Sequence, residues 1–286
     1  MKNTPFDPTQ YKIAQRQGWD QVAAGWRSWW KTFERAGQEV SDHLVSMAEI
    51  TAGQRVLDIA TGIGEPAITA AHRVGPAGEV FALDFAEAMV AIAQERATAH
   101  GRENITFAIS DAEQLDLPQQ SFDAALSRWG LMFLPNLVPA LSDIRQCLKE
   151  GGRLAAAVWS TPDKAPVASL ALRVVSQHIQ VPPSAPGTPG PFSLAEALAL
   201  THSLERAGFS NVRSERITIV WEFATAEDYT RFQREIAPPI TAMIAHLSAE
   251  QQSHIWQEIT EAARRYATPD GRVEIPGESI CVVGIA

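Results

Sequence analysis

The sequence predicts an α/β protein built on a doubly wound, Rossmann-like sheet of seven strands, mostly parallel with an antiparallel edge strand. Short apolar runs alternate with stretches whose apolar residues recur at helical spacing, which is typical of parallel strands joined by crossover helices. A glycine-rich turn at residues 62–67 follows the first of these runs, as in many ligand-binding α/β folds. The 286 residues, 45% of them apolar, suffice for one such unit with a sizeable insertion.

Helices are expected first. Apolar side chains recur at helical spacing through residues 10–50, and we expect residues 1–50 to form a helical lid. This segment contains Trp19, Trp26, Trp29 and Trp30. So many large apolar rings are not expected on a helix exposed to solvent. Trp19 and Trp26 are the candidates for closing over a ligand. The alternative is that this helix simply packs on the sheet.

Five strands are expected next, in residues 51–160, which would form the ligand-binding core. Their apolar runs are RVLDIA, EVFALD, ITFAIS, FDAALS and RLAAAVW. The stretches between several of them have helical spacing, and Gly151-Gly152 is a helix stop that leads into the fifth strand.

Beyond residue 160 the alternation ends. The stretch 181–192, VPPSAPGTPGPF, contains five prolines and two glycines, so neither a helix nor a central strand can form there. We expect residues 161–225 to hold this loop on the substrate side, a helix that ends near Arg206, and a strand at the sheet edge.

A helical cap is predicted for residues 226–272, inserted before the last strand of the core sheet at residues 273–286. Leu247, Ile255 and Ile259 recur at helical spacing after Ser248, which together with the residues that follow it is typical of a helix start.

Composition excludes several classes of function. The chain has 24 Lys and Arg against 33 Asp and Glu, a net charge of −9, which disfavours nucleic acid as a partner. Cys147 and Cys281 lack metal-binding spacing, so we expect no metal site. No apolar stretch is long enough to span a membrane, and the first residues do not resemble a secretion signal. These features favour a soluble cytoplasmic protein with a small-molecule partner, and they leave the oligomeric state open.

The glycine turn matches the dinucleotide-binding pattern, because Gly62, Gly64 and Ala67 satisfy G-x-G-x-x-G/A. In that motif a pyrophosphate lies on the helix N-terminus and accepts hydrogen bonds from free N–H groups. Here Asp58 precedes the turn and Glu65-Pro66 begins the helix, so carboxylates would repel the phosphates and proline offers no N–H. The same acids suit a ligand whose head carries an ammonium and a sulfonium.

Two further acids end the next two predicted strands. Asp84 ends the second strand, where its carboxylate can accept hydrogen bonds from both hydroxyls of a ribose. Asp111 ends the third, where it can accept one from an adenine amino group. The three strand ends together predict a site for S-adenosylmethionine.

On these motifs the sequence resembles the class I S-adenosylmethionine-dependent methyltransferases, closest to the small-molecule branch related to ubiquinone and menaquinone biosynthesis methyltransferases. The likeness covers residues 19–160 through VLDIATGIGE, VFALDFAEAM, ISDAEQL, FDAALSRWGLMF and LKEGGRLAAAVW. The resemblance implies that S-adenosyl-L-methionine is the cofactor and that it is held by Asp58, Ala60, Thr61, Gly62, Gly64, Asp84, Phe85, Met89, Asp111, Ala112, Ser127 and, from the lid, Trp26.

Position 60 departs from the more frequent glycine of this family. Ala60 predicts a backbone φ below zero, since a Cβ costs about 1 kcal/mol or more in the left-handed region.

The function expected from this resemblance is in-line transfer of the sulfonium methyl to O, N or C of a small, planar and apolar metabolite such as a phenol, quinol or indole. A non-catalytic S-adenosylmethionine-binding protein and an NAD-dependent oxidoreductase remain alternatives. Candidate substrate contacts are Trp19, Arg128, Trp129, Phe133, Trp159, Phe192 and Tyr229. For Arg128 the alternative is an ion pair with Asp20 or Glu65. No histidine is singled out by a motif, and no catalytic residue is assigned.

Overall fold

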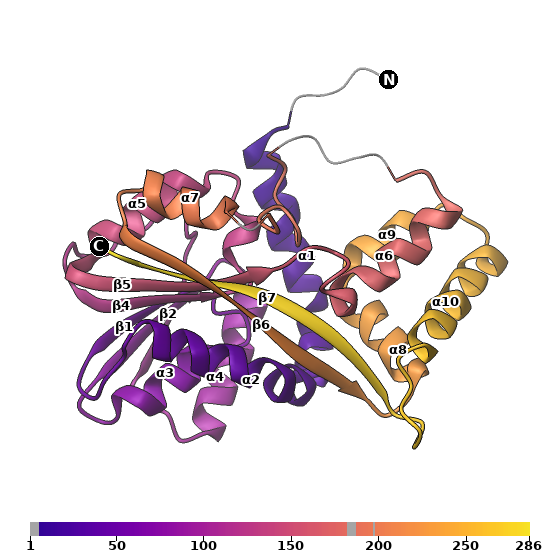
Figure 1. The fold of residues 1–286 in the computed structure, drawn as a ribbon, viewed down its shortest axis with the longest axis horizontal. Helices are drawn as coiled ribbons and strands as arrows, with labels where there is room; N and C mark the ends of the chain where they lie inside the picture. The colour runs from indigo at the N-terminus through magenta and orange to yellow at the C-terminus, as the bar shows by residue number, and fades with distance from the viewer. Residues whose placement is uncertain (1–5, 182–186, 197) are drawn as a thin grey trace.

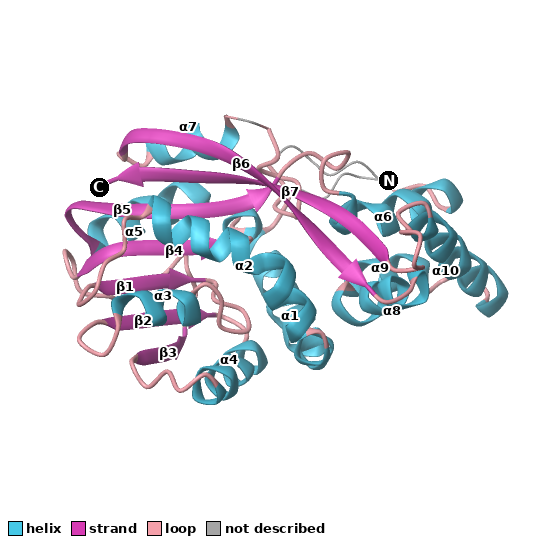
Figure 2. Cartoon of the chain, turned by 60° about the horizontal axis from the view of Figure 1, so that its bottom comes forward, coloured by secondary structure: helices cyan, strands magenta, loops and turns pink. Residues whose placement is uncertain are grey.

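A computed structural model describes residues 6–181, 187–196 and 198–286 of the protein. The strands in these ranges form one seven-stranded sheet in the order β3-β2-β1-β4-β5-β7-β6 (Figures 1 and 2). Their bounds are β1 Arg55–Ile59, β2 Glu79–Asp84, β3 Ile105–Ile109, β4 Phe122–Arg128, β5 Leu148–Trp159, β6 Ser210–Phe223 and β7 Val273–Ile285.

The sheet confirms the predicted fold class, but the antiparallel strand is not the strand at the edge of the sheet. Strands β1 to β5 pair in parallel, whereas β7 runs antiparallel to both of its neighbours, β5 and β6. The antiparallel strand therefore lies one place in from the edge. Its residues from Ser279 to Val283 are buried without alternation, as in an interior strand. Strand β6 is mostly exposed over its first half and carries charged residues there, which suits an edge.

Helices cover both faces of the sheet, with α2, α3 and α4 on one side and α5 and α7 on the other (Figure 1). The bounds of the α-helices are α1 Pro8–Ser28, α2 Trp30–Met47, α3 Ala67–Val74, α4 Glu87–Ala99, α5 Leu137–Cys147, α6 Pro166–His178, α7 Ala199–Arg206, α8 Ala226–Ile236, α9 Pro238–Ile244 and α10 Ala249–Arg264. A short 3₁₀ helix, η1, covers Leu131–Phe133. Both cysteines are buried.

The predicted helical insertion before the last strand consists of α8, α9 and α10. It lies at the far end of β6 and β7, which extend past the other strands (Figure 2). Helix α6 joins these three helices. The Val167 carbonyl of α6 accepts hydrogen bonds from the Tyr229 hydroxyl at 3.2 Å and the Gln233 amide at 3.1 Å. Residues 182–186 of the predicted proline-rich loop lie outside the described residues.

Helix α1 lies between the sheet with its covering helices and this insertion (Figures 1 and 2). Gly25 lets α1 approach α8 closely, because a Cβ there would overlap the Glu235 carbonyl. On the other side Val22 and Ala23 pack with Ile63 and Met89 in a small apolar cluster apart from the main core. Helix α1 thereby covers the glycine turn, and this placement defines the site below.

Candidate functional site

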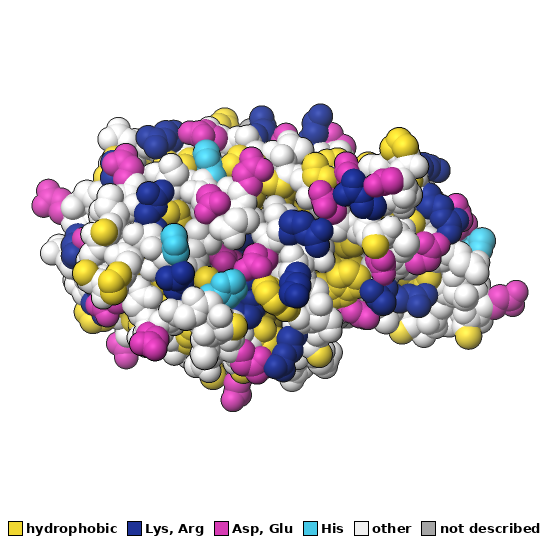
Figure 3. Space-filling view, turned by 90° about the horizontal axis from the view of Figure 1, so that it is seen from below, with side chains coloured by type: hydrophobic (Ala, Val, Ile, Leu, Met, Phe, Trp, Pro, Cys, Tyr) yellow, Lys and Arg dark blue, Asp and Glu magenta, His cyan; other side chains and the backbone are white. Residues whose placement is uncertain are grey.

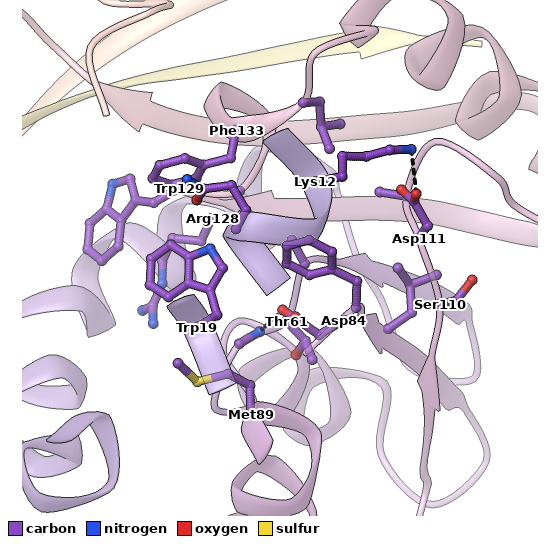
Figure 4. Close-up of a pocket in the computed structure, with 18 of the residues that line it drawn as sticks. Lys12, Trp19, Thr61, Asp84, Met89, Ser110, Asp111, Arg128, Trp129 and Phe133 are labelled. Carbon is purple, nitrogen blue, oxygen red and sulfur yellow. Dashed lines mark hydrogen bonds and ion pairs between the residues drawn. The ribbon is translucent and has the colours of Figure 1, made fainter. Parts of the chain in front are cut away.

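A pocket lies beneath α1 at the carboxyl ends of β1 to β4 (Figure 4). In the sheet order β1 lies beside β4, and the chain leaves these two strands in opposite directions, which opens the crevice where ligands bind in doubly wound folds. The fold therefore places one site at the strand ends singled out by the sequence.

The turn after β1 is left-handed at Ala60, with φ 56°, so the predicted negative φ is wrong. This conformation directs the Thr61 N–H to the Leu83 carbonyl at 2.9 Å and the Gly62 N–H to an Asp84 carboxylate oxygen at 2.8 Å. Two hydrogen bonds that join β1 to β2 thus offset a strain of about 1–2 kcal/mol. Directly across the crevice, Gly130 is needed because a Cβ there would come within 2.6 Å of the Ala60 Cβ.

Asp84 joins two backbone turns at the rim of the pocket. Its carboxylate accepts hydrogen bonds from the Gly62 N–H and, at 3.0 Å, from the Ala86 N–H, and only 7% of the residue is exposed. Burial raises the pKa of this carboxyl, while the backbone donors oppose that shift. The side chain lines the pocket, so its remaining acceptor capacity faces a ligand.

Asp58 lies behind the glycine turn and is fully buried. One carboxylate oxygen accepts the Ala67 N–H of α3 at 3.0 Å, and the other has no hydrogen-bond partner among the described residues. Burial raises the pKa of Asp58 to about 7, with a further increase from Glu65, while the Thr61 hydroxyl and Arg128 act in the opposite direction. A positive charge placed beside this buried carboxyl would therefore favour its ionised form.

Replacement of Asp58 by asparagine is expected to flatten the pH dependence of stability between about pH 4 and pH 7. The raised pKa means that the native state holds a proton which the unfolded chain releases near pH 4, so the free energy of unfolding falls as pH rises through this window and levels off above pH 7. The effect is on the order of a few kcal/mol. Urea titrations of both proteins at pH 5 and pH 8 measure it, and an equal pH dependence in both would contradict the assignment.

At the other end of the pocket, Asp111 is paired with a lysine from α1. The Lys12 ammonium lies 2.6 Å from an Asp111 oxygen and 3.1 Å from a Glu113 oxygen (Figure 4). Nearby on α1, the Tyr11 hydroxyl lines the pocket and is buried with no partner among the described residues. The start of α1 is thus tied to the loop after β3 by an ion pair, at the acid predicted to contact adenine.

Aromatic side chains form the end of the pocket that lies opposite Lys12 and Asp111. Trp19 makes edge contacts with Phe133 at 5.4 Å and with Trp26 at 5.6 Å between ring centroids. Trp129 has a left-handed backbone, φ 59°, stacks on Trp159 at 4.4 Å, and donates its indole N–H to Ser279 at 2.9 Å. Because both its ring and its N–H are engaged, Trp129 presents a fixed flat wall.

Arg128 lies beside this wall, with its guanidinium carbon 4.9 Å from the centroid of the Trp129 ring. The guanidinium donates to the Gly37 carbonyl at 2.9 Å and to the Ser41 hydroxyl at 2.8 Å, both on α2. Neither expected carboxylate forms an ion pair with it among the described contacts, since Asp20 accepts the Ala88 N–H and Glu65 accepts the Thr69 hydroxyl. Arg128 therefore remains a cation of the pocket lining.

The structure brings most of the predicted site residues to this pocket. Those that line it are Trp19, Trp26, Ala60, Thr61, Gly62, Asp84, Phe85, Met89, Asp111, Ala112, Arg128, Trp129 and Phe133. Asp58, Gly64 and Ser127 are not among the lining residues. Gly64 lies in the same turn with φ 100°, and Ser127 is fully buried in β4.

The geometry does not support Trp159, Phe192 and Tyr229 as substrate contacts. Tyr229 is fully buried and its hydroxyl donates to the Val167 carbonyl of α6. Trp159 lies behind Trp129, and Phe192 packs against the main core. Their aromatic character reflects core packing, the alternative that sequence cannot distinguish from a binding role.

Sequence reasoning missed part of the lining. Tyr11, Lys12 and Gln15 come from the first half of α1, and the others are Ile63, Leu83, Ser110, Gly130, Leu134 and Pro135. Glu65, which the sequence indicates for a cationic ligand, also lines the pocket. A signal existed for α1, because Tyr11, Gln15 and Trp19 are spaced four residues apart and therefore share one helix face.

Comparison with known proteins identifies the fold unit that carries the pocket. Residues 50–180 match a family model described as a methyltransferase domain. Among solved structures, a candidate methyltransferase from Bacillus halodurans C-125 superposes with a TM-score of 0.53 and 23% identity, over 86% of this chain and 97% of that one. At this identity, the similarity to the Bacillus structure shows a shared fold only.

Curated relatives are similar over about half of this chain. The aklanonic acid methyltransferase DauC of Streptomyces sp. strain C5 is 35% identical over 51% of this chain and 66% of its own length. The ubiquinone/menaquinone biosynthesis C-methyltransferase UbiE of Bordetella avium is 35% identical over 47% of this chain and 48% of its own length. In the described part of the chain, no helix is long and apolar enough to cross a membrane.

Proposed function

The chain belongs to the class I S-adenosylmethionine-dependent methyltransferases, related to the ubiquinone and menaquinone branch, and from this premise we propose that it methylates a small, planar, largely apolar metabolite. The observation that carries the proposal is one continuous pocket. It extends from Asp111 past Asp84 and the glycine turn to the aromatic wall at Trp129 (Figure 4).

The lining fits S-adenosylmethionine along its length. Asp84 would accept from the ribose hydroxyls, and Asp111 from the adenine amino group, next to Lys12. The acid Glu65, which lines the pocket, suits the ammonium of the methionine part, and Asp58 adds a buried carboxyl behind the glycine turn. S-Adenosylmethionine supplies a methyl group already activated by the sulfonium.

The residues of the chain would contribute mainly by positioning and by excluding water. Helix α1 closes the pocket with Trp19 and Trp26, and the fixed ring of Trp129 forms part of the pocket wall. Holding the reacting atoms about 3–3.5 Å apart and in line lowers a barrier by up to roughly 7–11 kcal/mol.

A small-molecule acceptor is favoured over nucleic acid. Positive and negative side chains alternate over the face drawn in Figure 3 instead of forming a basic field, and the net charge is −9. The relatives named for aklanonic acid and for ubiquinone and menaquinone biosynthesis point the same way.

The test is methyl transfer to a metabolite extract. Purified protein incubated with deuteromethyl S-adenosylmethionine is expected to shift the mass of at least one aromatic metabolite by one labelled methyl group. Protein without donor is one control, and donor without protein is the other. Binding of the donor by calorimetry with no labelled product from phenol, quinol and indole panels would instead support the non-catalytic alternative, and tighter binding of NAD would support the oxidoreductase.

A further inference from the structure

Arg128 is a pocket cation whose described hydrogen bonds go only to neutral groups. The other cation of the described lining, Lys12, is paired with two carboxylates. The bonds to Gly37 and Ser41 fix the orientation of the Arg128 guanidinium. Burial lowers the pKa of Arg128, while the carboxylates of Glu65 and Asp58 oppose that shift without a direct ion pair among the described contacts. A guanidinium held in this way is suited to bind an oxyanion with its remaining N–H groups.

Trp26 adds a hydrogen-bond donor at the same end of the pocket. Its indole N–H is buried and has no partner among the described residues, and its ring lines the pocket. Stacking on Phe33 at 3.9 Å with an interplanar angle of 14° fixes the ring. A buried donor left without a partner is destabilising, so a ligand acceptor at this position would satisfy it.

Helix α2 brings the two groups together. Phe33, which supports Trp26, lies one turn before Gly37, which accepts from Arg128. Gly37 itself is required, because a Cβ there would come within 2.6 Å of the Arg128 guanidinium and 3.3 Å of Trp129. Figure 4 shows Arg128 and Trp129 together at the end of the pocket opposite Lys12 and Asp111.

We propose that Arg128 and the indole N–H of Trp26 form a carboxylate-binding subsite at this end of the pocket. The proposal rests on the proposed function, because two carboxylates could reach it. One belongs to the methionine part of the cosubstrate and the other to an acidic acceptor. Glu65, only 5% exposed and also in the pocket lining, keeps the local charge balanced when no ligand is bound.

A pair of matched ligands tests the first source. S-Adenosylhomocysteine and S-adenosyl-3-thiopropylamine share the nucleoside, thioether and amine, and only the former has the carboxylate. Calorimetry with Arg128→Gln is expected to show a loss of about ten- to a hundredfold in affinity for the former and little change for the latter. Trp26→Phe keeps the stacked ring and removes the donor, and should give a smaller loss with the same selectivity.

The second source is tested with the homocysteine ligand saturating. If the acceptor supplies the carboxylate, wild-type protein binds 1-naphthoate more tightly than 1-naphthol, and both variants lose this preference while keeping their affinity for S-adenosylhomocysteine. Trp29→Phe is the matched control, because that indole N–H donates to Glu235 away from the pocket at 2.6 Å.

The outcomes separate the two proposals. Equal changes for both members of each ligand pair in Arg128→Gln and Trp26→Phe would overturn the subsite and leave the methyltransferase proposal intact. Failure of the wild-type protein to bind S-adenosylhomocysteine would overturn the proposed function, and the subsite with it. Thermal unfolding checks that each variant is folded. If Arg128→Gln does not fold, the ligand pairs are compared with Trp26→Phe alone, and that comparison decides whether the subsite exists.

Discussion

Asp84→Ala is expected to lower the affinity for S-adenosylmethionine by about ten- to a hundredfold, because hydrogen bonds to a charged acceptor contribute about 1.5–3 kcal/mol. The structure adds a second effect. The same carboxylate orders the backbone at Gly62 and Ala86, so the free energy of unfolding should also fall by about 1–3 kcal/mol. Titration calorimetry measures the first effect and urea denaturation the second.

Two further variants separate ligand contact from loop support. Asp84→Asn retains an acceptor for one backbone N–H, so it should stay closer to wild type in stability than in affinity. Asp111→Ala should weaken binding less than Asp84→Ala, since the adenine would keep its apolar neighbours. Wild-type affinity in Asp84→Ala would remove this residue from the binding site.

Deletion of residues 1–17 is expected to reduce cosubstrate affinity as well as turnover while the sheet stays folded, because its pocket-lining residues lie at the end of the pocket assigned to adenine. This segment carries Tyr11, Lys12 and Gln15 of the pocket lining but lies outside both apolar clusters of buried residues. A longer deletion through residue 30 is a poorer test. Trp29 packs on Phe223 and Phe232 in the main core, and loss of a buried aromatic ring costs about 3–5 kcal/mol.

Limited proteolysis tests whether this part of α1 is a lid coupled to the ligand. Trypsin should cut after Lys12 and Arg16 more slowly when S-adenosylmethionine is present, because part of the apolar surface that α1 covers would then belong to the ligand. Lys12→Met is the companion variant, since it removes the ion pair with Asp111 and Glu113. It also removes the trypsin site at residue 12, so the expected result is faster cleavage after Arg16 without ligand. Identical cleavage rates with and without ligand would mean that α1 is simply part of the fold.

The alternation of apolar runs with helical spacing was enough to predict the sheet and the strand ends that carry Asp58, Asp84 and Asp111. Such predictions succeed because burial imposes periodicity on residues close together in sequence. The backbone of Ala60 was not predictable in this way. Its φ is set by hydrogen bonds to Leu83 and Asp84 on a neighbouring strand, contacts that a propensity argument for a single residue does not include.

The aromatic residues show a second limit of sequence reasoning. Trp129 and Tyr229 were equally good candidates by composition, yet one lines the pocket and the other is buried in the helical insertion. Which side of an element faces a ligand depends on long-range packing, here on the stacking of Trp129 against Trp159 from the next strand. The ion pair of Lys12 with Asp111, about one hundred residues apart, depends on packing in the same way.

The long β6–β7 ribbon joins the helical insertion to the sheet at a single junction. The last residue of β6, Phe223, pairs with the first residue of β7, Val273, so the chain enters and leaves the helical insertion at neighbouring points. An insertion joined at adjacent ends can be exchanged for another of different length without moving the strands that pair with β5. The described pocket lining contains no residue of this insertion, so its replacement by a short turn should leave the strands and loops that form the pocket in place.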